Sequence, residues 1–146
     1  MKFPMTLASA AATLAFCCAA SADEIPYKAG SVVVVSAIKI KEGHFLDYWN
    51  FLSTKWRQEN EEAKKQGIVL SYEVLNAQAK SPNEPDLYLV ITYPNYAALD
   101  NLDQKMSAID KQLWGSLKQA SQADAERESI RTVLGSETLQ VYNFKP

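Results

Sequence analysis

Residues 31–76 read SVVVVSAIKIKEGHFLDYWNFLSTKWRQENEEAKKQGIVLSYEVLN, and this stretch carries the pattern that decides the fold. Residues 31–40 are mostly apolar and β-branched, which is typical of a buried strand. Residues 41–67 read as an amphipathic helix, with apolar side chains recurring every three to four positions in its first half. Residues 68–76 alternate along the chain as a strand does. The stretch therefore predicts a strand, a helix and a second strand in one continuous unit.

The rest of the chain repeats this order loosely. Residues 87–93 read LYLVITY and predict a third strand, joined to the second by a polar, proline-bearing hairpin loop. A helical run begins at Asn95, a further helix is expected over residues 121–134, and a last strand over residues 138–144. This strand, helix, strand, strand, helix, strand order predicts a ferredoxin-like α+β fold with a four-stranded antiparallel sheet. The additional helix lies before the last strand.

The predicted first strand, residues 32–40, is apolar on both faces. Val32, Val34 and Ile38 lie on one face, and Val33, Val35 and Ala37 lie on the other. Such a strand lies centrally in a sheet whose two faces are both covered. The chain's own helices are expected to cover one face. A second copy of the chain is expected to cover the other, so the sequence predicts a homodimer.

The predicted first helix is packed in its first half and solvated in its second. Phe45, Trp49, Leu52 and Trp56 recur at spacings of four, three and four residues, which places them on one helix face. Beyond Trp56 the helix is polar, and Gly67 is suited to end it.

Residues 1–22 have the features of an export signal. Lys2 supplies a positive start, the apolar run that follows is too short to span a bilayer, and a small-x-small pattern ends at Ala22. We therefore expect cleavage near Ala22 and a periplasmic or secreted protein. Residues 23–30 form a lead-in segment, and residues 31–146 form a single domain without a membrane span.

The composition also argues against several kinds of site and partner. The two cysteines, Cys17 and Cys18, lie within the predicted signal, so cleavage leaves no thiol for a disulfide, a nucleophile or a metal site. Neither follows a small residue, so a lipoprotein is the less favoured alternative. The 15 basic and 17 acidic residues are interspersed, which argues against a nucleic-acid partner. No twin arginine precedes the apolar run, so we expect export of an unfolded chain without a cofactor.

His44 is the single histidine, and it lies three residues before Asp47 at the start of the first helix. As a functional group it is a candidate general base, oriented by the carboxylate. The plainer interpretation is a polar residue of the first turn in contact with water, and the sequence favours it because no nucleophile accompanies the histidine. One histidine without clustered carboxylates also predicts no metal site.

Several features together resemble the dimeric α+β barrel superfamily. They are the order of elements, the length, the aromatic first turn of the first helix and the stretch LYLVITYPNYAALD at residues 87–100. The run from VVSAIKIKEGHFLDYW to IRTVLGSETL is similar to exported bacterial members of this superfamily whose role is unassigned. The superfamily includes antibiotic-biosynthesis monooxygenases and haem-degrading enzymes. The resemblance implies two four-stranded sheets packed face to face as a barrel, with the helices outside.

The resemblance also implies where a ligand binds. In the monooxygenase branch a tryptophan, an asparagine and tyrosines hold an aromatic substrate between sheet and helices without a cofactor. Tyr48, Trp49, Asn50 and Tyr72 are residues of these types. The haem-degrading branch uses a histidine on the second helix, which this sequence lacks, so haem is not implied. The structural alternative, which the helical spacing favours, is that these aromatic side chains form the core.

Two arginines, Arg127 and Arg131, are spaced one helical turn apart near the C-terminus. As a binding device, their guanidinium groups could clamp a carboxylate or a phosphate, and Arg131 is therefore a ligand-binding candidate. As a structural device, they would pair with the flanking Glu126, Glu128 and Glu137, and the sequence favours these ion pairs.

These features are compatible with two functions. The first is an exported, dimeric, small-molecule-binding barrel for an apolar or aromatic ligand, with Tyr48, Trp49, Tyr72 and Arg131 as ligand-binding candidates. If such a protein is an enzyme, we expect cofactor-free oxygenation or isomerisation with His44 as the base. The alternative is a non-catalytic envelope protein that acts through its dimer surface or a partner. A pocket holding His44 beside another polar side chain would favour the first, and a filled core with His44 in water the second.

Overall fold

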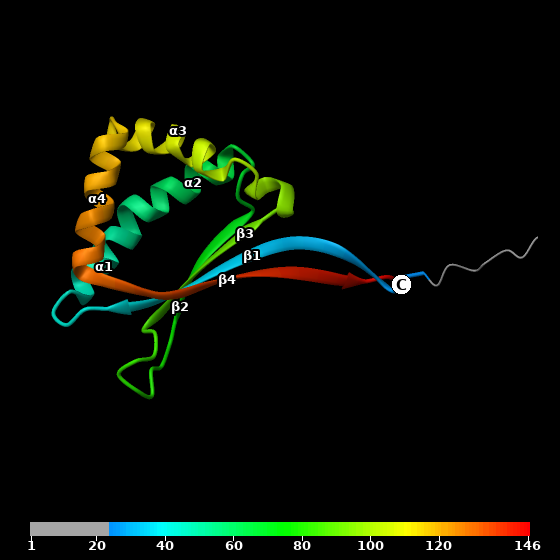
Figure 1. The fold of residues 1–146 in the computed structure, drawn as a ribbon, viewed down its shortest axis with the longest axis horizontal. Coiled ribbons are helices and arrows are strands. Elements are labelled where there is room, and N and C mark those ends of the chain that lie inside the picture. The colour runs from blue at the N-terminus through cyan, green and yellow to red at the C-terminus, as the bar shows by residue number, and fades with distance from the viewer. Residues whose placement is uncertain (1–23) are drawn as a thin grey trace, which may run out of the picture.

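The computed structural model describes residues 24–146, so the export signal predicted for residues 1–22 lies outside the described residues. Its four strands are β1 (Tyr27–Ile40), β2 (Ser71–Asn76), β3 (Leu87–Tyr93) and β4 (Arg131–Phe144). They pair antiparallel in the order β2-β3-β1-β4 and form one open sheet (Figure 1). The predicted α+β class and the ferredoxin-like arrangement are confirmed, with β1 in the interior of the sheet.

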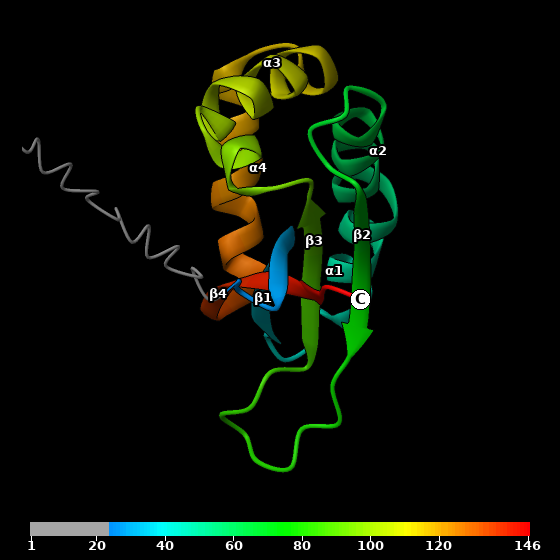
Figure 2. The ribbon, with the colours of Figure 1, turned by 90° about the vertical axis from the view of Figure 1, so that its right-hand side faces the viewer.

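The helices lie on one face of this sheet (Figures 1 and 2). They are α1 (Phe45–Phe51), the π-helical turn η1 (Leu52–Trp56), α2 (Arg57–Lys65), the 3-10 turn η2 (Tyr96–Leu99), α3 (Leu102–Trp114) and α4 (Leu117–Ile130). The segments α1, η1 and α2 follow one another without a break and together form the predicted first helix. Gly67, with φ +73°, follows its last turn in the left-handed region that glycine tolerates best.

The core lies between the helices and the sheet in two clusters. One cluster joins the sheet to α2 and α3, and its buried members are Val32, Ala63, Val69, Tyr93 and Ile109. The other joins the sheet to α1 and η1, and its buried members are Ile38, Tyr48, Leu52, Trp56 and Leu87. Both clusters use the face of β1 that carries Val32 and Ile38, which is one of the two apolar faces that the sequence predicts. The face that carries Val33 and Val35 contributes to neither.

The packed stripe of the first helix differs from the predicted one. Phe45 is 57% exposed and Trp49 is half-buried, whereas Tyr48, Leu52 and Trp56 are buried. These three are spaced by four residues, and the π-helical turn η1 lies among them. Because a π-turn closes its hydrogen bonds one residue later than an α-turn, the residues before it and the residues after it do not share the buried face that a regular α-helix would give them. The prediction that Phe45 belongs to the packed face is therefore wrong.

The last helix and the last strand meet earlier than predicted. Helix α4 spans Leu117–Ile130 and β4 begins at Arg131, so the helix predicted over residues 121–134 begins and ends too late, and the strand predicted over residues 138–144 is too short. The reason is the pairing of β4 with β1, which is continuous from Ile40↔Arg131 to Tyr27↔Phe144 apart from two bulges. Ladder hydrogen bonds outweigh a local helical pattern. Beyond the helices, β1 and β4 continue as a two-stranded ribbon (Figure 1).

The helical run predicted from Asn95 is divided. Asn95 accepts a hydrogen bond from the Ala98 backbone N–H (3.1 Å) and caps the short turn η2 rather than a long helix. Helix α3 then begins separately at Leu102, after Asn101 with φ 54°. Gly115, with φ +82°, separates α3 from α4.

Candidate functional site

His44 lies at the start of α1, where its ring meets the carboxylate expected to orient it. The Nδ1 atom is 2.9 Å from Oδ2 of Asp47. The two side chains are 42% and 60% exposed, so this pair faces water. The structure therefore contains the predicted contact but holds it at the surface, away from the buried part of α1.

Tyr48 and Arg131 come from distant parts of the sequence and meet where α1 packs beside the junction of α4 and β4. Tyr48 is fully buried, and the Arg131 Cζ atom lies 6.0 Å from the centre of its ring. Arg127 lies one turn before, with its Cζ atom 4.7 Å from the centre of the Phe51 ring. Trp49 neighbours Tyr48 on the helix and is half-buried. We call Tyr48, Arg127 and Arg131 the junction cluster.

The junction cluster contains buried polar atoms that have no partner. Among residues 24–146, the buried side-chain polar atoms without a hydrogen-bond partner are Tyr48 Oη, Trp49 Nε1, Arg127 Nε and Arg131 Nε. Three of the four belong to the cluster, Trp49 is the neighbour of Tyr48 on α1, and all four atoms carry a proton to donate. Burial raises the pKa of the Tyr48 hydroxyl, although the charges of Arg131 and Arg127 oppose the rise, so the hydroxyl is protonated at neutral pH. Unsatisfied buried donors are rare in proteins and call for a physical explanation.

Arg127 has an ion-pair partner, whereas Arg131 has none among residues 24–146. The Arg127 guanidinium contacts the Asp124 carboxylate, and burial lowers its pKa while the charge of Glu59 acts in the opposite direction. Burial raises the pKa of Glu59, even though Trp114 Nε1 donates a hydrogen bond to its Oε1 (3.0 Å). Within the part of the chain that the structure describes, Arg131 forms no ion pair.

The ion pairs that the sequence favoured for the two arginines are not formed. Neither Arg127 nor Arg131 pairs with Glu126, Glu128 or Glu137 among residues 24–146. The reason is the early end of α4, because Arg131 belongs to β4 and not to a helical turn that would share a face with those glutamates.

Tyr72 lies apart from the junction cluster, on β2 beneath the first helix. Its ring packs edge to face against Trp56 with ring centroids 5.2 Å apart, and its hydroxyl donates a hydrogen bond to the Glu61 carboxylate. Burial and the contact with Glu61 raise the pKa of Tyr72. Tyr72 thus has both a packing partner and a polar partner within the fold.

The face of the sheet opposite the helices carries none of the site residues that the sequence predicts. Register places Val33 beside Thr92 and Leu139, and Val35 beside Val90 and Glu137. No helix among the described residues packs on these side chains. We call this surface the open face. It contains a hollow of about 560 Å³ whose apolar wall is formed by Val35, Ala37, Tyr88, Pro85 and Leu134.

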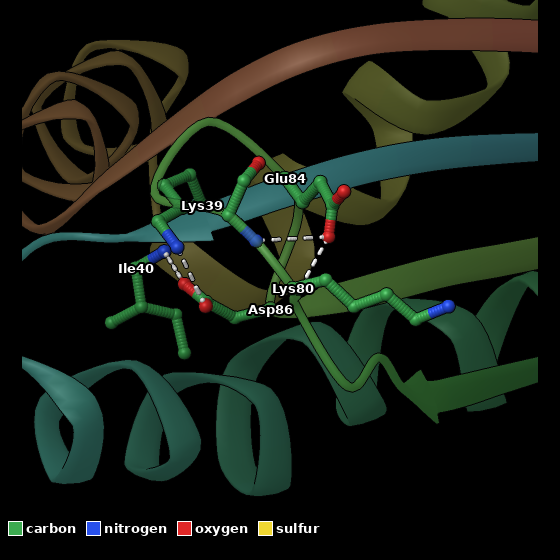
Figure 3. Close-up of polar contacts among 6 residues, drawn as sticks. Lys39, Ile40, Lys80, Glu84 and Asp86 are labelled. Atoms are coloured by element: carbon green, nitrogen blue, oxygen red, sulfur yellow. Dashed lines mark hydrogen bonds and ion pairs between the residues drawn. The ribbon is translucent and has the colours of Figure 1, made fainter.

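Residues 77–86 form one side of this hollow, and polar contacts hold the loop in place (Figure 3). Asp86 Oδ1 lies 2.9 Å from Lys39 Nζ, and its Oδ2 accepts a hydrogen bond from the Ile40 N–H (2.8 Å). Burial opposes ionisation of Asp86, but these contacts with Lys39 and Ile40 together lower its pKa. The Glu84 carboxylate accepts hydrogen bonds from backbone N–H groups at the start of the turn, Lys80 among them (Figure 3). The spacing of Ser81 and Glu84 is a capping signal visible in the sequence.

The described residues contain neither a metal-binding cluster nor a membrane-spanning helix. Between residues 24 and 146 no three side chains of His, Cys, Asp or Glu gather as a metal site would need. No helix in the same range has the length and apolar character needed to cross a bilayer.

Comparisons with models of known protein families and with curated proteins found no match. The chain is therefore described by its fold, an α+β ferredoxin-like sheet with helices on one face, and membership of the dimeric α+β barrel superfamily stays a prediction.

Proposed function

We propose that the protein is an exported homodimer that binds a small apolar or aromatic ligand between two sheets packed through their open faces. The observation that carries this proposal is the apolar character of the open face. On this face Leu75 lies beside Tyr88 and Leu139 lies beside Val33, and the two leucines are 50% and 48% exposed in the single chain. Apolar surface of this extent on a sheet favours packing against a second layer, because it removes the side chains from water.

The hollow in the open face supports a binding role. A second sheet would roof it, and ligand sites are commonly concave, mostly apolar and closed at an interface. Val35, Ala37 and Leu134 offer an apolar wall, and Ser136 and Glu137 place polar groups at its edge. An apolar or aromatic molecule with one polar substituent fits this lining.

The oligomeric state tests the dimer. We expect light scattering of the purified protein to give the mass of two chains. Leu139→Glu places a charge on the open face and is expected to yield a monomer. Leu46→Glu introduces the same charge on α1, where Leu46 is 72% exposed, and is expected to leave the dimer intact. A wild-type protein that is monomeric at every concentration would overturn the proposal.

Occupancy of the hollow tests the ligand. Ala37→Phe fills the hollow from β1 without adding charge. We expect native mass spectrometry to detect a small molecule that copurifies with the wild-type dimer and is missing from this variant. A dimer that is empty in both cases would instead support a non-catalytic envelope protein that acts through its dimer surface or a partner.

A cofactor-free oxygenase or isomerase is the second candidate, and the contact between His44 and Asp47 favours it. The exposure of both side chains makes binding the better supported role. Once a ligand is known, its conversion by the wild-type protein but not by His44→Ala would establish catalysis. Equal conversion by both proteins would remove His44 from consideration as the base.

A further inference from the structure

We propose that the junction cluster binds a small oxyanion, the carboxylate or phosphate group of a small molecule, with Arg131 as the main contact and Tyr48 and Arg127 as supporting donors. This site lies on the helix side of the sheet, away from the open face. It therefore does not depend on the dimer or on the ligand proposed for the hollow.

The first argument concerns hydrogen-bond donors. The unpartnered buried atoms of the cluster are Tyr48 Oη and the Nε atoms of Arg127 and Arg131. Tyr48 is fully buried, so its hydroxyl depends on a partner inside the fold for a hydrogen bond. Burying a donor without an acceptor costs free energy that an acceptor-rich group would restore. An oxyanion has several lone pairs and can accept from more than one of these donors at once.

The second argument concerns charge. Arg127 and Arg131 are close enough for each charge to affect Tyr48, and the charge of Arg131 disfavours the charged form of Arg127. Lys41 adds a third cation, since its Nζ donates a hydrogen bond to the Glu128 carbonyl (2.7 Å). Asp124 contacts Arg127, but Arg131 has no ion-pair partner among residues 24–146. An anion at Arg131 would relieve this repulsion.

The third argument concerns access. Arg131 lines a surface hollow of about 330 Å³ together with Glu128, Thr132 and Val133. An oxyanion can enter there and reach the guanidinium from the solvent side. The Glu128 carboxylate on the same hollow repels anions in proportion to their charge, so the hollow favours a single oxyanion group at Arg131 over a polyanion.

A purely structural explanation accounts for part of the cluster only. The C-terminal end of a helix attracts cations, and α4 ends at Ile130. Lys41 meets a carbonyl of this last turn directly. The Nε atoms of Arg127 and Arg131 and the Tyr48 hydroxyl meet no acceptor there, so the helix end leaves them unexplained.

Arginine Nε–H signals in a ¹⁵N-resolved NMR spectrum report directly on these donors. The purified protein is titrated with sodium phosphate and, separately, with sodium acetate at constant ionic strength. We expect saturable shifts of the Arg131 and Arg127 Nε–H signals with at least one probe, and an unmoved signal from the exposed Arg57. The probe that binds more tightly identifies a phosphate or a carboxylate ligand.

Matched variants complete the test. We expect Arg131→Gln to weaken binding at least tenfold, Tyr48→Phe to weaken it about threefold, and Arg57→Gln to leave it unchanged. If Arg131→Gln does not fold, Arg131→Lys replaces it in the test. Lysine keeps the positive charge but lacks the planar guanidinium group with its several N–H donors, so this variant should also weaken binding. Shifts that never saturate, shifts shared equally by Arg57, or wild-type affinity in both the Tyr48→Phe and the tested Arg131 variant would overturn the proposal.

Discussion

At the scale of single residues, Tyr48 shows that the fold decides whether the polar group of a side chain has a hydrogen-bond partner. In the sequence it is one aromatic residue among several on an amphipathic helix. In the structure its ring belongs to the core while its hydroxyl has no acceptor. Tyr72 has the opposite status, because its hydroxyl donates to Glu61. The same chemical group is thus unsatisfied at one position and satisfied at the other.

We predict that the same substitution has opposite effects at these two tyrosines. Tyr48→Phe removes an unsatisfied hydroxyl and should leave stability unchanged or raise it by up to about 1 kcal/mol in buffer without phosphate or carboxylate. Tyr72→Phe removes a hydrogen bond and should lower stability. Tyr48→Ala, which leaves a cavity, should cost about 3–5 kcal/mol. Urea denaturation followed by circular dichroism measures all three, and a clear loss in Tyr48→Phe would show that its hydroxyl has a partner.

Glu59 gives a prediction about pH. Burial raises its pKa in the folded state above the ordinary value of 4.5, so the folded state holds the proton more tightly than the unfolded state. The stability that Glu59 contributes is therefore present below about pH 4.5 and is lost as the pH rises through the folded-state pKa. We expect Glu59→Gln to be more stable than the wild type at pH 7, with a smaller difference at pH 4.

Glu62 supplies the control for this experiment. A hydrogen bond from Gln66 lowers the pKa of Glu62, so its contribution to stability is present above the ordinary pKa and is lost in acid. Glu62→Gln should therefore not gain stability at pH 7. Thermal unfolding of both variants at pH 4 and pH 7 gives the comparison, and equal gains in the two would contradict the assignment to burial of Glu59.

At the scale of elements, the boundaries depend on pairing between strands. Local pattern predicts a helix that continues to residue 134, but β4 pairs with β1 from Arg131 onward. The reason is that strand pairing forms backbone hydrogen bonds with a segment about a hundred residues away, which a window of neighbouring residues does not contain. The π-turn η1 likewise moves the buried stripe of the first helix to Tyr48.

The hairpin loop of residues 77–86 gives a prediction at this scale. Asp86 links the end of β1 to the loop through Lys39 and the Ile40 N–H (Figure 3). Asp86→Ala should lower stability at pH 7 by roughly 1 kcal/mol, a modest value because the pair is partly exposed. Since its pKa is lowered in the folded state, the difference from wild type should disappear as the pH falls through that pKa.

Hydrogen exchange locates this effect. The Ile40 amide should exchange faster in Asp86→Ala than in the wild type, while the Val34 amide, which lies farther along β1 from this contact, should serve as an unchanged reference. Unaltered protection at Ile40 would mean that the ladder alone holds the strand end, with no contribution from the carboxylate.

At the scale of the whole molecule, the open face is the face of the sheet that the helices of the described residues leave uncovered. One face of β1 is covered by the chain's own helices and the other carries Val33 and Val35 without a covering helix in the described residues. The sequence predicts both halves of this description, because alternation along one strand reveals two apolar faces. What covers the second face is the subject of the dimer proposal.

If two chains cover each other, thermal stability must depend on protein concentration. We expect the Tm of the wild type to rise by about 3 °C for each tenfold increase in concentration, since dissociation accompanies unfolding. The Leu139→Glu variant should show a Tm that does not change with concentration. Differential scanning calorimetry over a hundredfold range measures this, and a constant Tm in the wild type would count against the dimer.

The sequence by itself determined the order of the elements, the α+β class and the presence of two apolar faces on β1, because these follow from local periodicity. The tertiary structure alone decided where α4 ends, that Tyr48 and Arg131 meet, and that their polar atoms lack partners. The physical reason is that burial and hydrogen-bond satisfaction depend on what distant segments bring to a side chain, and no window of neighbouring residues contains that information.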